Sequence, residues 1–156
     1  MSKKPRPKKK YHPRRIAVPS YIASLDSSVG QVQEVGRSED RLFLLRIANR
    51  TADNDDLVTH CQLFRAAWLL AERMDDAKTI RTCLYDGVVA IGGYLCDDPT
   101  EFTDKLFEDL NCAVEVSRSI FENTGKIERA QAMAAVIENR FTLEMMEKEE
   151  KQDRGC

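Results

Sequence analysis

Apolar residues recur every three or four positions along most of the chain, which is the period of an α-helix that buries one face. The pattern predicts a short helix over about residues 39–50, three longer helices that begin after Asp53, Asp76 and Asp98, and a fifth helix over about residues 126–149. No segment alternates apolar and polar residues over a useful strand length. We therefore expect an all-α fold, a four- to five-helix antiparallel bundle.

The apolar positions also predict which side of each helix is buried. The helix after Asp53 has two adjoining apolar stripes, so we expect it to lie at the centre of the fold with Trp68 in the core. These stripes are Leu57, Cys61, Phe64, Trp68 and Ala71, and Leu63, Ala67, Leu70 and Met74. The predicted buried sides of the first and last helices are Leu42, Leu45 and Ile47, and Ile127, Ala130, Ala134, Ile137, Phe141 and Met145.

This amount of apolar surface predicts a homodimer. We expect a four- or five-helix monomer to leave part of the central helix and of Phe141, Met145 and Met146 uncovered. Large uncovered apolar patches mark interfaces, and two-fold dimers are the commonest homo-oligomers. The alternative is that residues 16–36 cover this surface as an intramolecular arm.

Local capping signals support the predicted helix boundaries. Asp53 is a suitable N-cap for the second helix. Asp98, Pro99 and Glu101 form a capping-box arrangement at the start of the fourth helix, which we expect to end at Gly125 in the left-handed conformation. Capping and the helix dipole explain the acidic pairs without a catalytic or Mg²⁺ role. These pairs are Asp55-Asp56, Asp75-Asp76 and Asp97-Asp98.

Composition divides the chain into four parts. Residues 1–15 contain three prolines and almost nothing apolar, so they cannot bury enough surface to offset the entropy of ordering. We expect them to form a disordered basic tail. Residues 16–36 are predicted to be a partly ordered arm, residues 37–150 the helical bundle domain, and residues 151–156 a frayed C-terminus.

The tail is a functional signal with a physical mechanism. It has eight Lys and Arg residues and no acid, whereas the rest of the chain has 16 basic and 26 acidic residues and a net charge of −10. Such a tail can be merely solubilising, can neutralise nucleic-acid phosphates, or can contact an acidic surface of a host protein or of its own chain. The candidate contacts are Lys3, Lys4, Arg6, Lys8, Lys9, Lys10, Tyr11, Arg14 and Arg15.

Catalytic, cofactor and metal motifs are missing from the sequence. His60 and Cys61 are adjacent and point in different directions on a helix, so we expect His60 to be a core or rim residue rather than a zinc ligand. No phosphate-binding glycine motif occurs, and no base is visible beside a cysteine. We expect a protein that is not an enzyme and binds no cofactor or metal.

We expect the chain to be soluble and cytoplasmic, without membrane contact. No apolar run approaches the roughly 18 residues of a membrane helix, and no apolar segment of a secretory signal follows the basic start. The cysteines are odd in number and include no CxxC pair, which argues against a disulfide framework. They are Cys61, Cys83, Cys96, Cys112 and Cys156.

The segment Lys8-Lys9-Lys10-Tyr11-His12-Pro13-Arg14-Arg15 resembles the KKYRPR-type start of small helical proteins from proteobacterial phages and prophages. In those proteins a stretch like residues 52–71 follows, with an acidic pair before an apolar helix, and later an Asn-Thr-Gly turn like residues 123–125. Leu57 stands where that family has an aromatic residue. The resemblance covers most of the chain, implies no catalytic residues, and implies a phage accessory gene whose product binds a host factor.

The main hypothesis is therefore a non-enzymatic binding protein, a phage or prophage accessory factor in the host cytoplasm. It would antagonise or modulate a host system by binding a host protein or sequestering a ligand, and its acidic body could mimic nucleic acid toward a basic protein. One alternative is a nucleic-acid-associated protein that uses the tail. Another is a small-molecule sponge or enzyme with a pocket between helices. A single acidic face would favour the binding protein. A basic groove that continues the tail would favour nucleic-acid binding, and a closed polar pocket would favour a small-molecule ligand.

Overall fold

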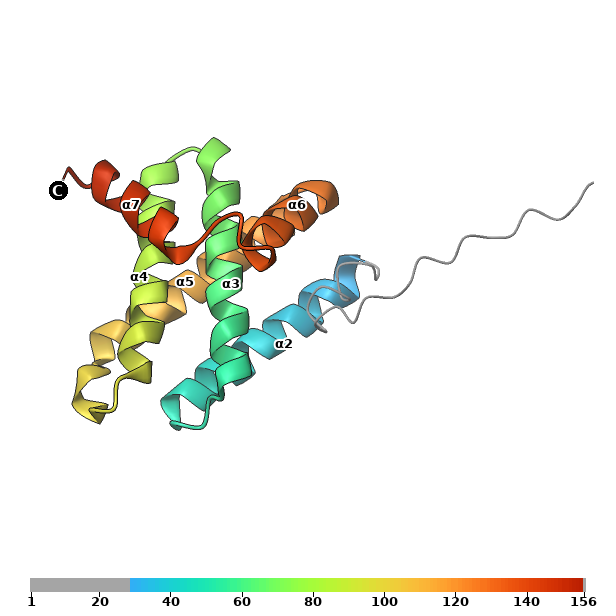
Figure 1. The fold of residues 1–156 in the computed structure, drawn as a ribbon. Coiled ribbons are helices and arrows are strands. Elements are labelled where there is room, and N and C mark those ends of the chain that lie inside the picture. Colours follow the sequence, from blue (N-terminus) through green and yellow to red (C-terminus); the bar gives the residue numbers. More distant parts are fainter. Residues whose placement is uncertain (1–28, 156) are drawn as a thin grey trace, which may run out of the picture.

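The structure, a computed structural model, describes residues 29–155. All regular structure in this part of the chain is helical, which confirms the all-α prediction. These residues form six α-helices, rather than the predicted four or five, and two short 3-10 helices. The α-helices are α2 (Val29–Ala48), α3 (Asn54–Leu70), α4 (Ala77–Leu95), α5 (Asp104–Asn123), α6 (Lys126–Ile137) and α7 (Leu143–Asp153), and the 3-10 helices are η2 (Ala71–Arg73) and η3 (Pro99–Glu101) (Figure 1).

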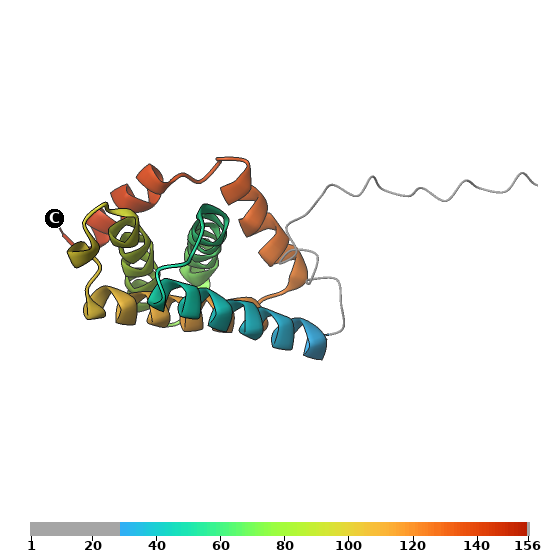
Figure 2. The same cartoon turned by 90° about the horizontal axis from the view of Figure 1, so that it is seen from below.

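The helices pack around a central pair, α3 and α4. These two run antiparallel, side by side, and η2 lies in their connection (Figure 1). Seen from below, α2 and α5 lie lengthwise across one side of the pair, while α6 lies beside α3 and α7 beside α4 (Figure 2). The other helices therefore cross or flank an antiparallel pair instead of extending it into one regular array.

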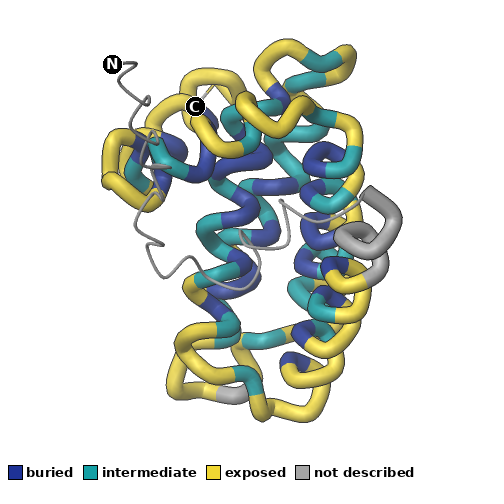
Figure 3. Tube along the Cα trace, turned by 90° about the vertical axis from the view of Figure 1, so that its right-hand side faces the viewer, coloured by how far each residue is buried: buried dark blue, intermediate teal, exposed yellow. Residues whose placement is uncertain are grey.

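Helix α3 is central, as its two apolar stripes predict. All members of both stripes are buried or pack against the core, and Trp68 is fully buried. The Trp68 ring stacks on Phe141 with 5.3 Å between ring centroids, and the Arg81 guanidinium lies 3.7 Å from the Trp68 centroid. The homodimer prediction was based on spare apolar surface on α3, Phe141, Met145 and Met146. Helices of the same chain cover both stripes of α3, Phe141 and Met146, whereas Met145 is 45% exposed. In Figure 3 the buried residues (dark blue) follow the inward sides of the helices.

Helix α2 begins at Val29, well before the predicted start at residue 39, so residues 29–36 of the predicted arm are helical. Its inward side repeats at helical spacing through Gly36, Asp40, Phe43 and Ile47, all of them buried. A Cβ atom at Gly36 would collide with the guanidinium of Arg118, so glycine allows the close approach of α2 to α5. The predicted buried side was wrong for Leu42 and Leu45, which are 51% and 56% exposed, because the close approach at Gly36 turns the side with Phe43 inward instead.

The helix starts predicted after Asp53 and Asp76 are both confirmed, but only the Asp53 side chain caps its helix. The Asp53 carboxylate accepts a hydrogen bond from the Asp56 backbone N–H at 2.8 Å, and the Asp56 side chain in turn accepts from the Asp53 N–H at 3.4 Å. This reciprocal pair is a capping box. Asp76 precedes α4 in the left-handed conformation, with φ of 59°, and its side chain makes no capping hydrogen bond. The acidic pair at residues 75–76 is therefore not explained by side-chain capping.

The capping signal at Asp98 starts a 3-10 helix and not the long α5. The Asp98 carboxylate accepts from the Thr100 backbone N–H at 2.9 Å. The backbone then leaves the helical region at Phe102, with φ of −93° and ψ of 89°. Thr103 provides the N-cap of α5, accepting from the Leu106 N–H at 3.4 Å. The predicted start of this helix was wrong because a second cap follows the first after five residues.

Helix α5 ends at Asn123 without a left-handed glycine. Gly125 has φ of −64° and ψ of 149°, so its predicted conformation was wrong, and it serves as the N-cap residue of α6. Side chains bind the last carbonyl groups of α5 instead. Thr124 Oγ1 donates to the Ile120 carbonyl at 2.5 Å, and Asn123 Nδ2 donates to the Ser119 carbonyl at 2.8 Å.

The predicted fifth helix is two helices. Asn139 adopts the left-handed conformation, with φ of 55°, and Thr142 caps α7 by accepting from the Met145 backbone N–H at 3.3 Å. A continuous apolar stripe cannot pass through this change of direction. Ile127, Ile137 and Met145, which were predicted to be buried, are 73%, 44% and 45% exposed. The buried residues of α6 are Ala132, Met133 and Val136.

Candidate binding surfaces

The residues predicted to contact nucleic acid or a partner all lie outside the part of the chain that the structure describes. The surfaces described below therefore do not include them. They are Lys3, Lys4, Arg6, Lys8, Lys9, Lys10, Tyr11, Arg14 and Arg15.

Neighbouring His60 and Cys61 lie in different surroundings, as expected from their adjacency on a helix. His60 is buried, and Cys61 is half-buried, where burial raises the pKa of its thiol. Among residues 29–155, no group of three or more His, Cys, Asp or Glu side chains is placed to hold a metal ion. Within the same range, no helix has the length and apolar composition of a membrane span.

A buried ion pair fixes α2 against α5. Arg118 donates from Nε to Asp40 Oδ2 at 2.7 Å and from Nη2 to Asp40 Oδ1 at 2.9 Å. The same Nη2 donates to the Gly36 carbonyl at 3.1 Å. The Arg118 and Asp40 side chains are only 12% and 11% exposed. The His60 ring stacks on Phe43 with centroids 3.6 Å apart and brings its Nε2 to 3.5 Å from Asp40 Oδ1, which is long for a hydrogen bond.

This pair also sets the charge state of Asp40. Burial by itself would raise the pKa of the Asp40 carboxyl, but the His60 ring and the Arg118 guanidinium favour the charged form and hold the pKa below its ordinary value. Sequence patterns gave no sign of the pair, because Asp40 and Arg118 are 78 positions apart. The pair locks the rotation of α2 about its axis, so the opposite side of that helix faces outward.

That outward side presents three large apolar residues beside the exposed Ser38 and Arg41. Val35, Leu42 and Leu45 are 48%, 51% and 56% exposed, and they follow one another at helical spacing on the side opposite Phe43 and Ile47. We call these three residues the outer face of α2, a helix at the edge of the molecule (Figure 1). A helix that is apolar on both sides normally has a partner on each. The predicted helix of residues 39–50 already contains Leu42 and Leu45, but Val35 joins them only when the helix begins earlier, as α2 does.

A groove of about 520 Å³ lies between α2 and α5. Its charged groups are balanced, since Arg37 pairs with Glu122 at 3.2 Å and Arg118 pairs with Asp40. The groove therefore does not continue the positive charge of the N-terminal residues. Its charged lining is Arg37, Arg41 and Arg118 together with Asp40, Glu115 and Glu122.

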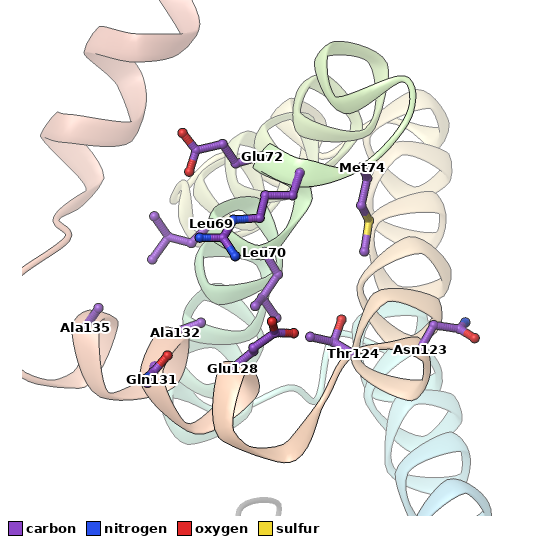
Figure 4. A pocket seen from close by; sticks show the side chains of 11 residues that line it. Leu69, Leu70, Glu72, Met74, Asn123, Thr124, Glu128, Gln131, Ala132 and Ala135 are labelled. Atoms are coloured by element: carbon purple, nitrogen blue, oxygen red, sulfur yellow. The ribbon is translucent and has the colours of Figure 1, made fainter.

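A second groove, of about 450 Å³, lies where the end of α3 and η2 face the junction of α5 and α6 (Figure 4). Leu70 and Met74 line one side, and Thr124 and Glu128 line the other. The groove is open to the surface, and its lining mixes apolar, amide and charged side chains without converging on one point. It is not the closed polar pocket that a small-molecule site would favour.

Acidic side chains gather where α4 connects to α5. Residues 97–109 include six acidic residues and a single lysine, and five of the six acids are exposed. Lys105, the single lysine of this segment, pairs with Asp109 at 3.0 Å. The segment therefore has a net negative charge. We call this region the acidic end, which lies at the start of α5, away from α6 (Figure 1). Its acids are Asp97, Asp98, Glu101, Asp104, Glu108 and Asp109.

Comparison of the chain with family models, with curated proteins and with solved structures finds no match. The resemblance of residues 8–15 to phage proteins therefore stays a prediction. The function proposed for this chain is based on its own surfaces.

Proposed function

We propose that this chain is a non-enzymatic binding protein that assembles as a homodimer and acts by occupying the surface of another protein. The observation that carries the proposal is the outer face of α2, which is apolar and about half exposed on a helix whose other side is already buried. Burial of apolar surface is favourable by about 25 cal/mol per Å². A second copy offers an identical face, and a two-fold axis pairs the two faces with each other.

The partner that we propose for the dimer is a protein with a basic surface. The acidic end concentrates negative charge on exposed side chains, which attracts a positively charged surface and speeds its association. A dimer has two acidic ends, so a partner with two basic sites is bound more tightly without any new contact. The resemblance of residues 8–15 to phage proteins supports a phage or prophage accessory factor that modulates a host system in the cytoplasm.

Capture of proteins from a proteobacterial lysate, with and without nuclease treatment, tests this proposal. The full-length protein is compared with a triple variant of the acidic end, Glu101→Gln, Asp104→Asn and Glu108→Gln. The matched control removes three charges from α7, by Glu144→Gln, Glu147→Gln and Asp153→Asn. All six residues are exposed.

We expect the wild type and the α7 control to capture the same basic protein, and the acidic-end variant to lose most of it. Equal capture by the acidic-end variant would contradict the proposed role of this region. Loss of all capture after nuclease treatment would favour the nucleic-acid function instead.

Nucleic-acid binding is the second candidate function, and the eight basic residues among residues 1–15 favour it. Lysine and arginine neutralise phosphates without reading sequence. The rest of the chain would oppose this binding because it has 26 acidic and 16 basic residues. We rank it second for that reason.

A further inference from the structure

Helices α4 and α5 approach each other closely at two small residues. A Cβ atom on Gly87 of α4 would collide with the Cβ of Ala113 on α5. Cys83 lies one turn before Gly87, and Cys112 immediately precedes Ala113. The close approach of the two helices therefore brings two cysteines, 29 positions apart in the sequence, to the same place.

The two sulfur atoms are in direct contact. Cys83 Sγ lies 2.7 Å from Cys112 Sγ, while both are free thiols. A disulfide bond has an S–S distance of about 2.05 Å, so a small side-chain movement is enough to form one. Cys112 is exposed and Cys83 is half-buried, so a molecule in solution reaches Cys112 first.

We propose that Cys83 and Cys112 form an oxidation site, at which a small disulfide such as oxidised glutathione converts the two thiols into an intramolecular disulfide. This inference is independent of the proposed binding function. It is compatible with reduced cysteines in a reducing compartment, because the bridge forms only when the oxidant is supplied.

The reaction takes two steps. Cys112, as its thiolate, attacks one sulfur of oxidised glutathione, which forms a mixed disulfide and releases one glutathione thiolate. Cys83 then loses its proton and attacks the Cys112 sulfur, which breaks the mixed disulfide and releases the second glutathione. Two protein thiols are oxidised by two electrons, one glutathione disulfide is reduced to two thiols, and the two protons pass to the released thiolates.

The surroundings of Cys83 disfavour its thiolate in the reduced protein. Burial, then the hydrogen bond with Cys112 and the negative charges of Asp86 and Asp109, raise the pKa of the Cys83 thiol to about 12. The cations nearby are already paired, Lys105 with Asp109 and Arg154 with Asp86. In the mixed disulfide Cys112 no longer contributes, but burial and the charges of Asp86 and Asp109 still disfavour the Cys83 thiolate, so the rate of ring closure should rise as the pH is raised toward 9.

Mass spectrometry of the reduced full-length protein after treatment with oxidised glutathione tests the proposal. We expect Cys83 and Cys112 of the wild type to lose their thiols without a glutathione adduct on either residue, and non-reducing digestion to give one peptide pair joined through Cys83 and Cys112. The thermal midpoint of the bridged protein should rise by roughly 5–10 °C and return when a reductant is added.

Three variants separate this site from other cysteine chemistry. Cys83→Ser should accumulate a stable glutathione adduct on Cys112, because no resolving thiol remains. Cys112→Ser should leave Cys83 unmodified, and Cys96→Ser, which removes another exposed cysteine, should bridge as the wild type does. A wild type that keeps a stable adduct on Cys112, or that bridges equally through other cysteines, would overturn the proposal.

Discussion

Arg118 neutralises the charge of the buried Asp40 carboxylate. Its guanidinium binds both oxygens of Asp40, and the two side chains are almost completely shielded from water. Removal of one partner leaves a buried charge without compensation, which costs far more than the loss of an exposed pair. The Arg37–Glu122 pair, formed by the same two helices, provides the comparison, because Arg37 is 59% exposed.

Arg118→Met should destabilise the protein by about 3–5 kcal/mol. Arg37→Met should leave the midpoint of urea unfolding nearly unchanged, because exposed pairs are solvated and screened. Equilibrium unfolding of both variants, followed by circular dichroism, measures the difference. Equal effects of the two substitutions would show that burial of the Asp40–Arg118 pair has no special importance.

The same pair predicts a dependence of stability on pH. The pKa of folded Asp40 lies below its ordinary value of 3.8, so its contribution is fully present above that value and is lost as the pH falls through the folded pKa. In Arg118→Met, burial favours the protonated form of Asp40, which carries no charge. The difference in the free energy of unfolding between the wild type and Arg118→Met should therefore become smaller as the pH falls from 6 to 3. A difference that stays constant over this range would contradict the assigned charge state.

Between elements, the packing of α4 on α5 depends on a missing side chain. Gly87 faces Ala113 and the Phe64 ring, whereas Gly92, on the same helix, has no neighbouring atom within 4 Å. Both glycines have a poor helix propensity, but only Gly87 gains close packing in return. The sequence shows two similar glycines, and only the fold distinguishes their roles.

Gly87→Ala should destabilise the protein by about 1–3 kcal/mol, because the new methyl group overlaps Ala113. Gly92→Ala, the matched control, should stabilise it by about 0.5–1 kcal/mol through the helix propensity of alanine. Thermal unfolding of the two variants gives the sign of each effect. A stabilising Gly87→Ala would mean that α4 and α5 pack less closely than described.

The helices and the starts of α3 and α4 could be predicted, but the other helix ends and the directions of the helices could not. Asp53 and Asp56 are within four residues of each other, so their capping box is visible in the sequence. The turn at Asn139 is hidden, because apolar residues continue at helical spacing on both sides of it. The Asp40–Arg118 pair and the contact of Cys83 with Cys112 join distant segments, which no local pattern records.

For the whole molecule, residues 1–15 are basic and the rest of the chain is acidic. The first part should attract DNA and the second should repel it. Deletion of residues 1–15 should abolish any binding to DNA and leave thermal stability unchanged. In full-length protein the log–log slope of affinity against salt should stay below roughly seven, which is about 0.9 for each of eight neutralised phosphates. A salt series on duplex and single-stranded DNA measures this slope. Strong binding by the truncated protein would place the nucleic-acid contact on the helices instead.

Assembly through the outer face of α2 is the central claim, and the mass in solution tests it most directly. Static light scattering at micromolar concentration should give twice the 17.8 kDa of one chain. The double variant Leu42→Ser and Leu45→Ser should fall to the mass of a single chain. Val89→Ser with Ile127→Ser, two exposed apolar residues on other helices, should remain a dimer. A wild-type mass of 17.8 kDa, or equal dissociation of both double variants, would contradict this interface.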